Sequence, residues 1–274
     1  MQLIAPNRGT QGFTSVSGRC QDRPTPSALL WDQRATAGDC RLLVPRVPFC
    51  SPSCGSSGVC VMDGRCEPHA VARPVGAVRV TGVRTSAGMA PWELTLVSGS
   101  YQTPGALTLP YPAFAEGDTL RIDAAGAGGV APFSVETRGI VPLALTSTDL
   151  RVEMNRALDL TWTAAGVAGS RVKVKLDISH HGGTRGMITC DTDDDGALTL
   201  APELLTQLLA LGVAGFPTVV VTRSRAGTTT VGAGSVELVV SSELETEVTI
   251  PGLRSCTSDA DCMGGTCRPD LTCT

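Results

Sequence analysis

The middle of the chain alternates between apolar and polar residues, a pattern typical of strands that bury one face and expose the other. The longest such run covers residues 172–178. Shorter runs lie near residues 78–80, 94–96, 120–123, 133–135, 150–154, 158–162, 236–238 and 248–250. Many short strands at this spacing are typical of packed antiparallel sheets. We therefore predict a mainly β protein with an antiparallel β-sandwich, either immunoglobulin-like or jelly-roll-like.

A single segment has the period of a helix. Pro202 suits a first helical position, Gly212 suits the residue after the last turn, and apolar side chains recur on one face between them. These apolar residues are Leu204, Leu205, Leu208, Leu209 and Leu211. We predict one short helix, inserted between two strands of the sandwich.

The chain divides by composition into three regions. Residues 1–72 are rich in cysteine and turn-forming residues, and we expect a cysteine-rich N-terminal module there. Residues 73–253 are the β-sandwich region, which is either one continuous sandwich or two with a boundary near residue 146. Residues 254–274 are expected to form a cysteine-rich C-terminal module.

Composition and charge argue against two classes of protein. The formal net charge is −4 and no cluster of Lys or Arg creates a basic surface, so we expect no nucleic-acid partner. No apolar run approaches the roughly 18 residues that span a bilayer, so we expect no transmembrane segment. Aromatic residues make up only 4% of the chain, and the core must therefore be built mainly from aliphatic side chains.

The chain has 11 cysteines, and their surroundings indicate disulfides. The residues between them near both ends are small, polar and turn-forming, so apolar burial alone cannot order these segments. We expect disulfides within an N-terminal group of Cys20, Cys40, Cys50, Cys54, Cys60 and Cys66, and within a C-terminal group of Cys256, Cys262, Cys267 and Cys273. In the C-terminal group we expect the interleaved pairs Cys256–Cys267 and Cys262–Cys273, one of three connectivities.

Cys190 stands alone between the two groups. It shares the apolar face of a strand with Ile188, so we expect a free, buried thiol. Zinc ligation or reduced thiols are the alternatives to disulfides, but no two cysteines have the Cys-x2-Cys spacing that zinc sites favour.

Disulfides persist in oxidising compartments, so ten paired cysteines predict an extracytoplasmic protein: secreted, periplasmic or on the outer-membrane surface. Residues 1–8 lack the basic and apolar regions of a signal peptide. We therefore expect the numbering to begin near the mature chain, or the true start codon to lie upstream.

Several short motifs are spread over most of the chain. They are Pro48-Phe49-Cys50 with Cys54-Gly55 and Val59-Cys60, Pro110-Tyr111-Pro112-Ala113-Phe114, Ala124-Ala125-Gly126, and Cys256-Thr257-Ser258-Asp259-Ala260-Asp261-Cys262. In these motifs the chain resembles a group of uncharacterised, secreted, cysteine-rich lipoproteins of myxobacteria. The resemblance implies an exported protein with a lipid anchor on a cysteine upstream of Met1. It implies no activity, because that group has no assigned one.

Residues 191–196, here called the acidic turn, carry a possible cation site. Asp191, Asp193 and Asp195 alternate and are followed by Gly196, which is how an EF-hand calcium loop begins. Pro202 occupies the position where such a loop has a bidentate glutamate. The sequence leaves two interpretations open: a weak calcium site, or a solvated hairpin turn in which Asp195-Gly196 supplies a positive φ.

His180 and His181 end one predicted strand and lie a hairpin away from Cys190. This arrangement suggests a copper or zinc site, or a cysteine–histidine nucleophile. Strand parity argues against including Cys190. Ile178 marks the buried face of the first strand, and Cys190 shares the buried face of the second strand with Ile188. Cys190 then lies several residues along the sheet from His180. A secreted hydrolase with a site near His180 and His181 remains one alternative function.

Four aromatic residues could stack on sugars if they share an exposed face: Trp31, Trp92, Tyr101 and Tyr111. Trp162 alternates with two leucines and is expected in the core. Taken together, the sequence favours a non-enzymatic secreted or cell-surface protein, an interaction or structural module whose partner is an unknown protein or glycan. The alternatives are a calcium-stabilised carbohydrate-binding module and the hydrolase.

Overall fold

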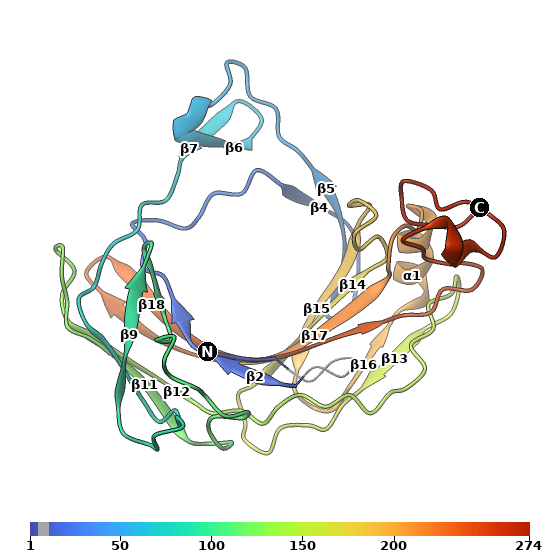
Figure 1. The fold of residues 1–274 in the computed structure, drawn as a ribbon. Coiled ribbons are helices and arrows are strands. Elements are labelled where there is room, and N and C mark those ends of the chain that lie inside the picture. Colours follow the sequence, from blue (N-terminus) through green and yellow to red (C-terminus); the bar gives the residue numbers. More distant parts are fainter. Residues whose placement is uncertain (5–10) are drawn as a thin grey trace.

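The computed structural model describes residues 1–4 and 11–274 and consists mainly of strands (Figure 1). Its largest sheet has eight strands, in the spatial order β2 (Phe13–Ser15), β1 (Gln2–Ile4), β18 (Gly234–Glu247), β17 (Thr218–Val231), β14 (Arg171–Asp177), β15 (Met187–Asp193), β5 (Cys40–Arg46) and β4 (Leu30–Ala37). Neighbouring strands are antiparallel except β1 and β18, which are parallel.

A second sheet has six strands, in the order β12 (Phe133–Arg138), β11 (Thr119–Ala124), β8 (Val78–Thr81), β9 (Trp92–Val97), β10 (Ser100–Gln102) and β3 (Ser17–Gly18). Two strand pairs lie outside these sheets: β13 (Leu158–Thr161) with β16 (Ala197–Leu200), and β6 (Gly58–Met62) with β7 (Arg65–Pro68). Short 3₁₀ turns cover Gly55–Ser57 and Asp259–Cys262. The prediction of a mainly β sandwich protein is confirmed.

The predicted helix is present as α1 (Pro202–Ala210), between β16 and β17. Pro202 occupies its first turn, and Gly212 follows it with a φ of 92°, a conformation that glycine adopts without steric cost. In the described part of the chain, no helix is long and apolar enough to cross a membrane.

The described residues form two large cores and a smaller hydrophobic cluster of Val75, Val78, Tyr101 and Ala124. The first core lies between α1, the β13–β16 pair and the eight-stranded sheet. It buries the α1 residues Leu204, Leu205, Leu208 and Leu209 against, among others, Leu160, Val172, Val174, Leu176, Val219 and Val221. These are the apolar positions that the alternating and helical patterns predict. Each fully buried leucine stabilises the fold by roughly 2 kcal/mol relative to an exposed one.

The second core lies between the two large sheets, which pack face to face. Leu3 and Val240 come from the eight-stranded sheet, and Val80 and Leu120 from the six-stranded sheet. The sheets approach so closely that a Cβ on Gly227 of β17 would lie 1.7 Å from the carbonyl oxygen of Glu136 in β12. Only a glycine is compatible with this approach.

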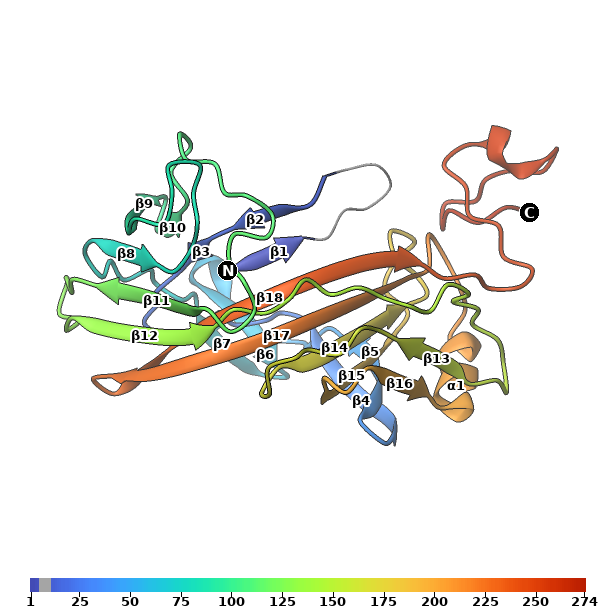
Figure 2. The same cartoon turned by 90° about the horizontal axis from the view of Figure 1, so that it is seen from below.

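The long hairpin of β17 and β18 joins the two cores. Figure 2 shows it running the length of the molecule, beside β11 and β12 at one end and towards α1 at the other. The chain passes from the second core at Ile140 to the first core at Leu143, close to the alternative boundary near residue 146. β17 contributes Val219 and Val221 to the first core, whereas β18 contributes to both, with Leu244 against the first and Val240 in the second.

A buried ion pair lies where the two cores meet. The side chains of Arg223 and Asp194 are 0% and 3% exposed, and the guanidinium Nε donates to the Asp194 carboxylate at 2.6 Å. Arg223 also donates to the carbonyl oxygens of Val141, at 3.2 Å, and of Thr163. The pair therefore joins β17, the end of β15 and the segment that crosses between the cores.

The described residues form five disulfides, and their pairing differs from the sequence prediction at Cys20, Cys40 and Cys190. The expected pairs Cys256–Cys267 and Cys262–Cys273 are present, and two more disulfides are Cys50–Cys60 and Cys54–Cys66. Cys190 is not free but bonded to Cys40. Its predicted burial is correct; the pairing was missed because β5 lies beside β15 and places Cys40 directly opposite Cys190.

Residues 1–72 do not form a separate module. The hairpins β1–β2 and β4–β5 join the eight-stranded sheet because β1 pairs with β18 and β5 with β15. β3 joins the six-stranded sheet because it pairs with β10. Only the β6–β7 hairpin, with its two disulfides, projects on its own (Figure 1). At the other end, the C-terminal segment is bonded to the rest through Asp270, whose carbonyl accepts a hydrogen bond from the Gly215 N–H at 2.7 Å.

Candidate functional site

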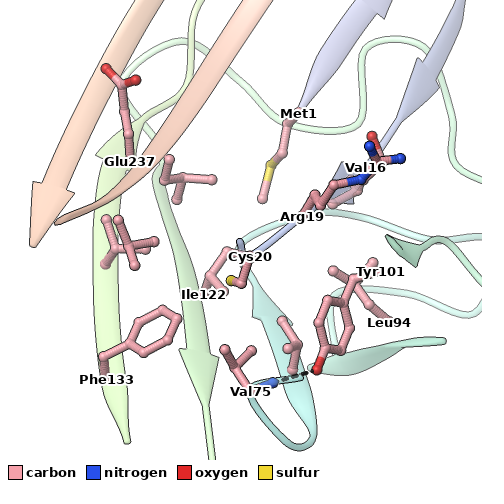
Figure 3. Close-up of a pocket in the computed structure, with 16 residues that line it drawn as sticks. Met1, Val16, Arg19, Cys20, Val75, Leu94, Tyr101, Ile122, Phe133 and Glu237 are labelled. Carbon is pink, nitrogen blue, oxygen red and sulfur yellow. Dashed lines mark hydrogen bonds between the residues drawn. The ribbon is translucent and has the colours of Figure 1, made fainter. Parts of the chain in front are cut away.

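An apolar hollow lies against the smaller hydrophobic cluster, which includes Val75, Val78 and Tyr101 (Figure 3). It is a cavity of about 100 Å³ between the six-stranded sheet and the far end of the β17–β18 hairpin. Its apolar lining includes Val16, Val75, Val78, Leu94, Tyr101, Ile122, Phe133, Val135, Val236 and Leu238. These side chains come from strands of both sheets and from the segment before β8, so only the assembled sandwich creates the cavity.

Tyr101 fixes one wall of this cavity. It is 4% exposed, and its hydroxyl accepts a hydrogen bond from the Val75 N–H at 2.9 Å and donates to the Gly76 carbonyl at 2.9 Å (Figure 3). A buried tyrosine needs such partners for its hydroxyl. The two bonds hold the segment before β8 in place across the end of the sheet.

Cys20 lies at the mouth of the cavity, and Figure 3 shows its sulfur amid the apolar side chains. It was expected in a disulfide, but it is the free cysteine, because Cys190 takes the partner that the N-terminal group would have offered. Burial raises the pKa of the Cys20 thiol, which keeps it in the neutral form. The backbone of Cys20 is held by a hydrogen bond from the Arg73 N–H at 2.8 Å.

A wider groove of about 680 Å³ adjoins the cavity. The two hollows share six lining residues, Arg19, Cys20, Val75, Phe133, Val236 and Glu237. The groove is also lined by Arg73, Asp22 and the glycine pair Gly128-Gly129. Both arginine and carboxylate side chains therefore line it. The site therefore combines an apolar cavity with a polar, charged entrance.

Asp22 is held in this entrance by hydrogen bonds to both of its carboxylate oxygens. Arg23 donates to it at 3.1 Å and the Val71 N–H at 2.9 Å. The Arg23 hydrogen bond, followed by the bond from Val71, lowers the pKa of the Asp22 carboxyl. The carboxylate therefore stays charged and oriented at physiological pH.

The acidic turn does not gather the three carboxylates expected for calcium. Asp191 and Asp193 instead bind Arg171, at 2.7 Å to its Nε and 2.6 Å to an Nη nitrogen. Asp195 accepts a hydrogen bond from the Ala197 N–H within the turn. In the described residues, the groups of three possible ligands whose atoms lie within 4.8 Å of one another are cysteines of the two disulfide clusters. A cross-strand arginine thus pairs with two of the aspartates, an arrangement that favours the solvated turn over the calcium site.

The structure separates His180 and His181 from Cys190, which is bonded to Cys40. It brings His180 instead towards Glu245 of β18, with 3.6 Å between Nε2 and Oε1. Both histidines line a cleft on the eight-stranded sheet. The cysteine–histidine interpretation is therefore wrong, and the carboxylate of Glu245 lies near His180 instead.

The predicted aromatic platform is not formed. Tyr101 is buried, Trp92 and Tyr111 pack against the second core, and Trp31 lies on β4 at the edge of the other sheet. With so few aromatic residues in the chain, those in the sandwich serve mainly as core. Trp162 is buried as predicted and donates a hydrogen bond to Asp194 at 2.8 Å.

Comparisons with known proteins give little further information. No protein-family model matches the chain, and no curated protein matches it in sequence. A two-domain fibronectin type III segment of chicken tenascin is 14% identical, with 81% of this chain and 99% of that chain covered and a TM-score of 0.20. The FN1–FN3 domains of chicken CNTN1 are 11% identical, with 86% and 72% covered and a TM-score of 0.20. Scores this low do not show a common fold.

Sequence reasoning missed two features of the cavity, Cys20 as its free thiol and Tyr101 as its wall. The odd number of cysteines signals one unpaired thiol but does not say which. The alternating residues of β8 and β11 identify one wall, but the opposing wall comes from β18, more than 100 residues away along the chain.

Proposed function

We propose that the protein is a non-enzymatic, extracytoplasmic binding protein that holds an apolar side group of a peptide or protein partner in the Cys20 cavity. The observation that carries this proposal is the junction of an apolar cavity of about 100 Å³ with a charged groove of about 680 Å³. Ligand sites commonly combine an apolar pocket with a few polar groups that fix orientation.

The volume of the cavity limits which side chains can enter it. Apolar protein cavities of about 150 Å³ hold a benzene molecule. This cavity is smaller, at about 100 Å³, so a leucine side chain is near its upper limit, whereas a phenylalanine ring is too large and a lipid chain too long. The groove outside contains Arg19, Arg73, Asp22 and Glu237, which can bind the amides and charges of a peptide backbone.

The extracytoplasmic location is supported by the disulfides and by the resemblance to secreted lipoproteins. Ten of the 11 cysteines are paired, and two pairs order a C-terminal segment of 254–274 that has little apolar burial. Such segments depend on an oxidising compartment. A partner at the cell surface fits this location.

The free thiol permits a direct test. A dansyl group attached to Cys20 reports on the mouth of the cavity, because no other free thiol competes for the label. We expect N-acetyl-leucine amide to change its emission at millimolar concentration. N-acetyl-phenylalanine amide, whose ring is too large, and N-acetyl-glycine amide, which has no side chain, should have no effect. Methyl shifts of Leu94 and Ile122 in the unlabelled protein should follow the same order.

Two variants at one position provide the control. Ile122 lines the cavity, so Ile122→Phe should fill it and abolish the shifts, whereas Ile122→Val should enlarge it and preserve them. The proposal is wrong if the leucine and glycine amides act alike, or if Ile122→Phe binds as the parent does.

A secreted hydrolase is the second candidate, favoured by the approach of His180 to Glu245. The neighbouring Ser179 is not a suitable nucleophile, because it is fully buried and its hydroxyl donates to Asp177 at 3.2 Å. Hydrolysis would therefore require an activated water molecule. Turnover of p-nitrophenyl acetate that is lost in His180→Ala but kept in His69→Ala would favour this candidate.

A further inference from the structure

One edge of β18 is only partly covered by β1. β17 pairs with all 14 residues of β18 on one side, whereas on the other side β1 pairs only with Ser241–Glu243. Beyond that contact β18 continues past the Cys20 cavity, where Val236 and Glu237 line the hollow. Within the described part of the chain, no strand pairs with residues 235–239 on the β1 side. This stretch of β18 is therefore an open sheet edge beside the cavity.

The hydrogen bonds of Met1 show which backbone groups face this edge. The Met1 amino group donates to the Val239 carbonyl at 2.6 Å, and the Met1 carbonyl accepts a hydrogen bond from the Ser241 N–H at 2.9 Å. Residues two apart in a strand direct their backbone groups to the same edge. The N–H and C=O groups of Ser235 and Glu237, and the N–H of Val239, therefore face the groove, with no described strand beside them.

The opposite wall of the groove offers backbone groups as well. The carbonyl oxygens of Val16 and Cys20 accept backbone hydrogen bonds at 3.0 and 2.8 Å, and Gly18 pairs with β10 of the six-stranded sheet. These even-numbered residues bond away from β18. By the same alternation, the backbone groups of Ser17 and Arg19 face the other edge, on which β1 lies beside β2. Both residues line the cavity.

These two walls continue the space that β1 fills. β1 lies between β18 and β2, and the outer strands of such a trio are about 10 Å apart, twice the spacing of paired strands. Met1 and Leu3 pack into the second core, and Met1 also lines the cavity together with Glu237 and Arg19 (Figure 3). A strand that continues this line directs every second side chain to the same face as Met1 and Leu3, and so towards the cavity.

We propose that the partner is an extended peptide segment that adds to β18 as a strand in line with β1. This inference rests on the function proposed above and deepens it, because it states how the main chain of the peptide is held. The leucine side chain enters the Cys20 cavity. In the direction of β1, the leucine N–H donates to the Glu237 carbonyl and the leucine carbonyl accepts a hydrogen bond from the Val239 N–H. In such strand addition, main-chain bonds supply affinity and side-chain pockets supply specificity.

The test is a titration of the unaltered, disulfide-bonded protein with two peptides that have the same side chains. One is acetyl-Thr-Thr-Leu-Thr-amide, and in the other an ester oxygen replaces the leucine N–H. We expect the ester peptide to bind about tenfold more weakly, measured by the methyl shifts of Leu94 and Ile122, because the Glu237 carbonyl loses its donor. The amide peptide should also slow hydrogen exchange at the N–H groups of Glu237 and Val239.

Two variants at one position provide a matched pair. Val239→Pro removes the N–H that faces the groove and leaves the bonds of β18 to β17 in place, whereas Val239→Ala keeps that N–H. Val239 is partly exposed, so neither change opens a core. We expect the proline variant to bind the amide peptide about tenfold more weakly and the alanine variant to bind it as the parent does.

The outcomes separate strand addition from the binding of a side chain alone. If the amide and ester peptides bind equally while N-acetyl-leucine amide still shifts the methyl signals, strand addition is wrong and the cavity stands. If no leucine ligand shifts them, the proposed function itself fails. If the protein alone self-associates in sedimentation and protects the N–H groups of Glu237 and Val239, a second copy is the occupant and the partner peptide is overturned.

Discussion

The buried pair of Arg223 and Asp194 makes the sharpest prediction about stability. Both side chains are almost fully buried, and the Asp194 carboxylate also accepts hydrogen bonds from Trp162 at 2.8 Å and Ser170 at 2.9 Å. Asp194→Ala leaves the guanidinium buried without its counter-charge. Removing one partner of such a pair typically costs about 3–5 kcal/mol. That is a large share of the roughly 5–15 kcal/mol that stabilises a folded domain.

Urea unfolding with the disulfides intact, followed by tryptophan fluorescence, measures this cost. The matched control is Asp195→Ala, which removes an exposed neighbour and should change the free energy of unfolding by less than about 0.5 kcal/mol. The double variant Asp194→Ala, Arg223→Met should recover part of the loss, because no unpaired charge remains buried. Equal losses in Asp194→Ala and Asp195→Ala would refute the reasoning.

The same pair predicts how stability depends on pH. Burial opposes ionisation of Asp194, but hydrogen bonds from Arg223, Trp162 and Ser170 outweigh it and lower the pKa of the carboxyl. A carboxyl with a lower pKa in the folded state binds fewer protons there than in the unfolded state. Its contribution is therefore complete above its unfolded pKa of about 3.9 and is lost as the pH falls through the folded value. The difference in unfolding free energy between the parent and Asp194→Asn should narrow below about pH 4.

Three further predictions concern the disulfides, the sheet contact and the acidic turn. Replacing Cys40 and Cys190 together by alanine should cost about 2–5 kcal/mol of unfolding free energy in urea, because this disulfide closes a loop with a sequence separation of 150 residues. Gly227→Ala should cost about 1–3 kcal/mol or more, because its Cβ would meet the Glu136 carbonyl, whereas Gly105→Ala, with nothing within 4 Å, should be nearly neutral in the same assay. Calcium at millimolar concentration should leave the Tm unchanged in calorimetry, because Asp191 and Asp193 are already paired with Arg171; a rise that is abolished by Asp193→Asn would contradict this.

The sequence by itself determined the features that depend on near neighbours. The alternation over residues 172–178 predicts β14 and its buried face, and the leucine stripe with Pro202 and Gly212 predicts α1. The C-terminal disulfides join cysteines 11 residues apart, so their segment contains its own partners. Strand period, helix period and turn chemistry are encoded within a few residues, and for that reason they can be recognised without knowing the fold.

Only the tertiary structure decided which distant residues meet. Parity correctly placed Cys190 on a buried face, but its bond to Cys40 depends on β5 lying beside β15, which no local pattern states. The same holds for Arg223, which β17 carries to an aspartate that the sequence pattern treated as a spacer between calcium ligands. Both the Cys20 cavity and the histidine cleft are formed by strands separated by many tens of residues. Their chemistry follows from the order of strands in the sheets, and this order is set by the packing of the whole chain.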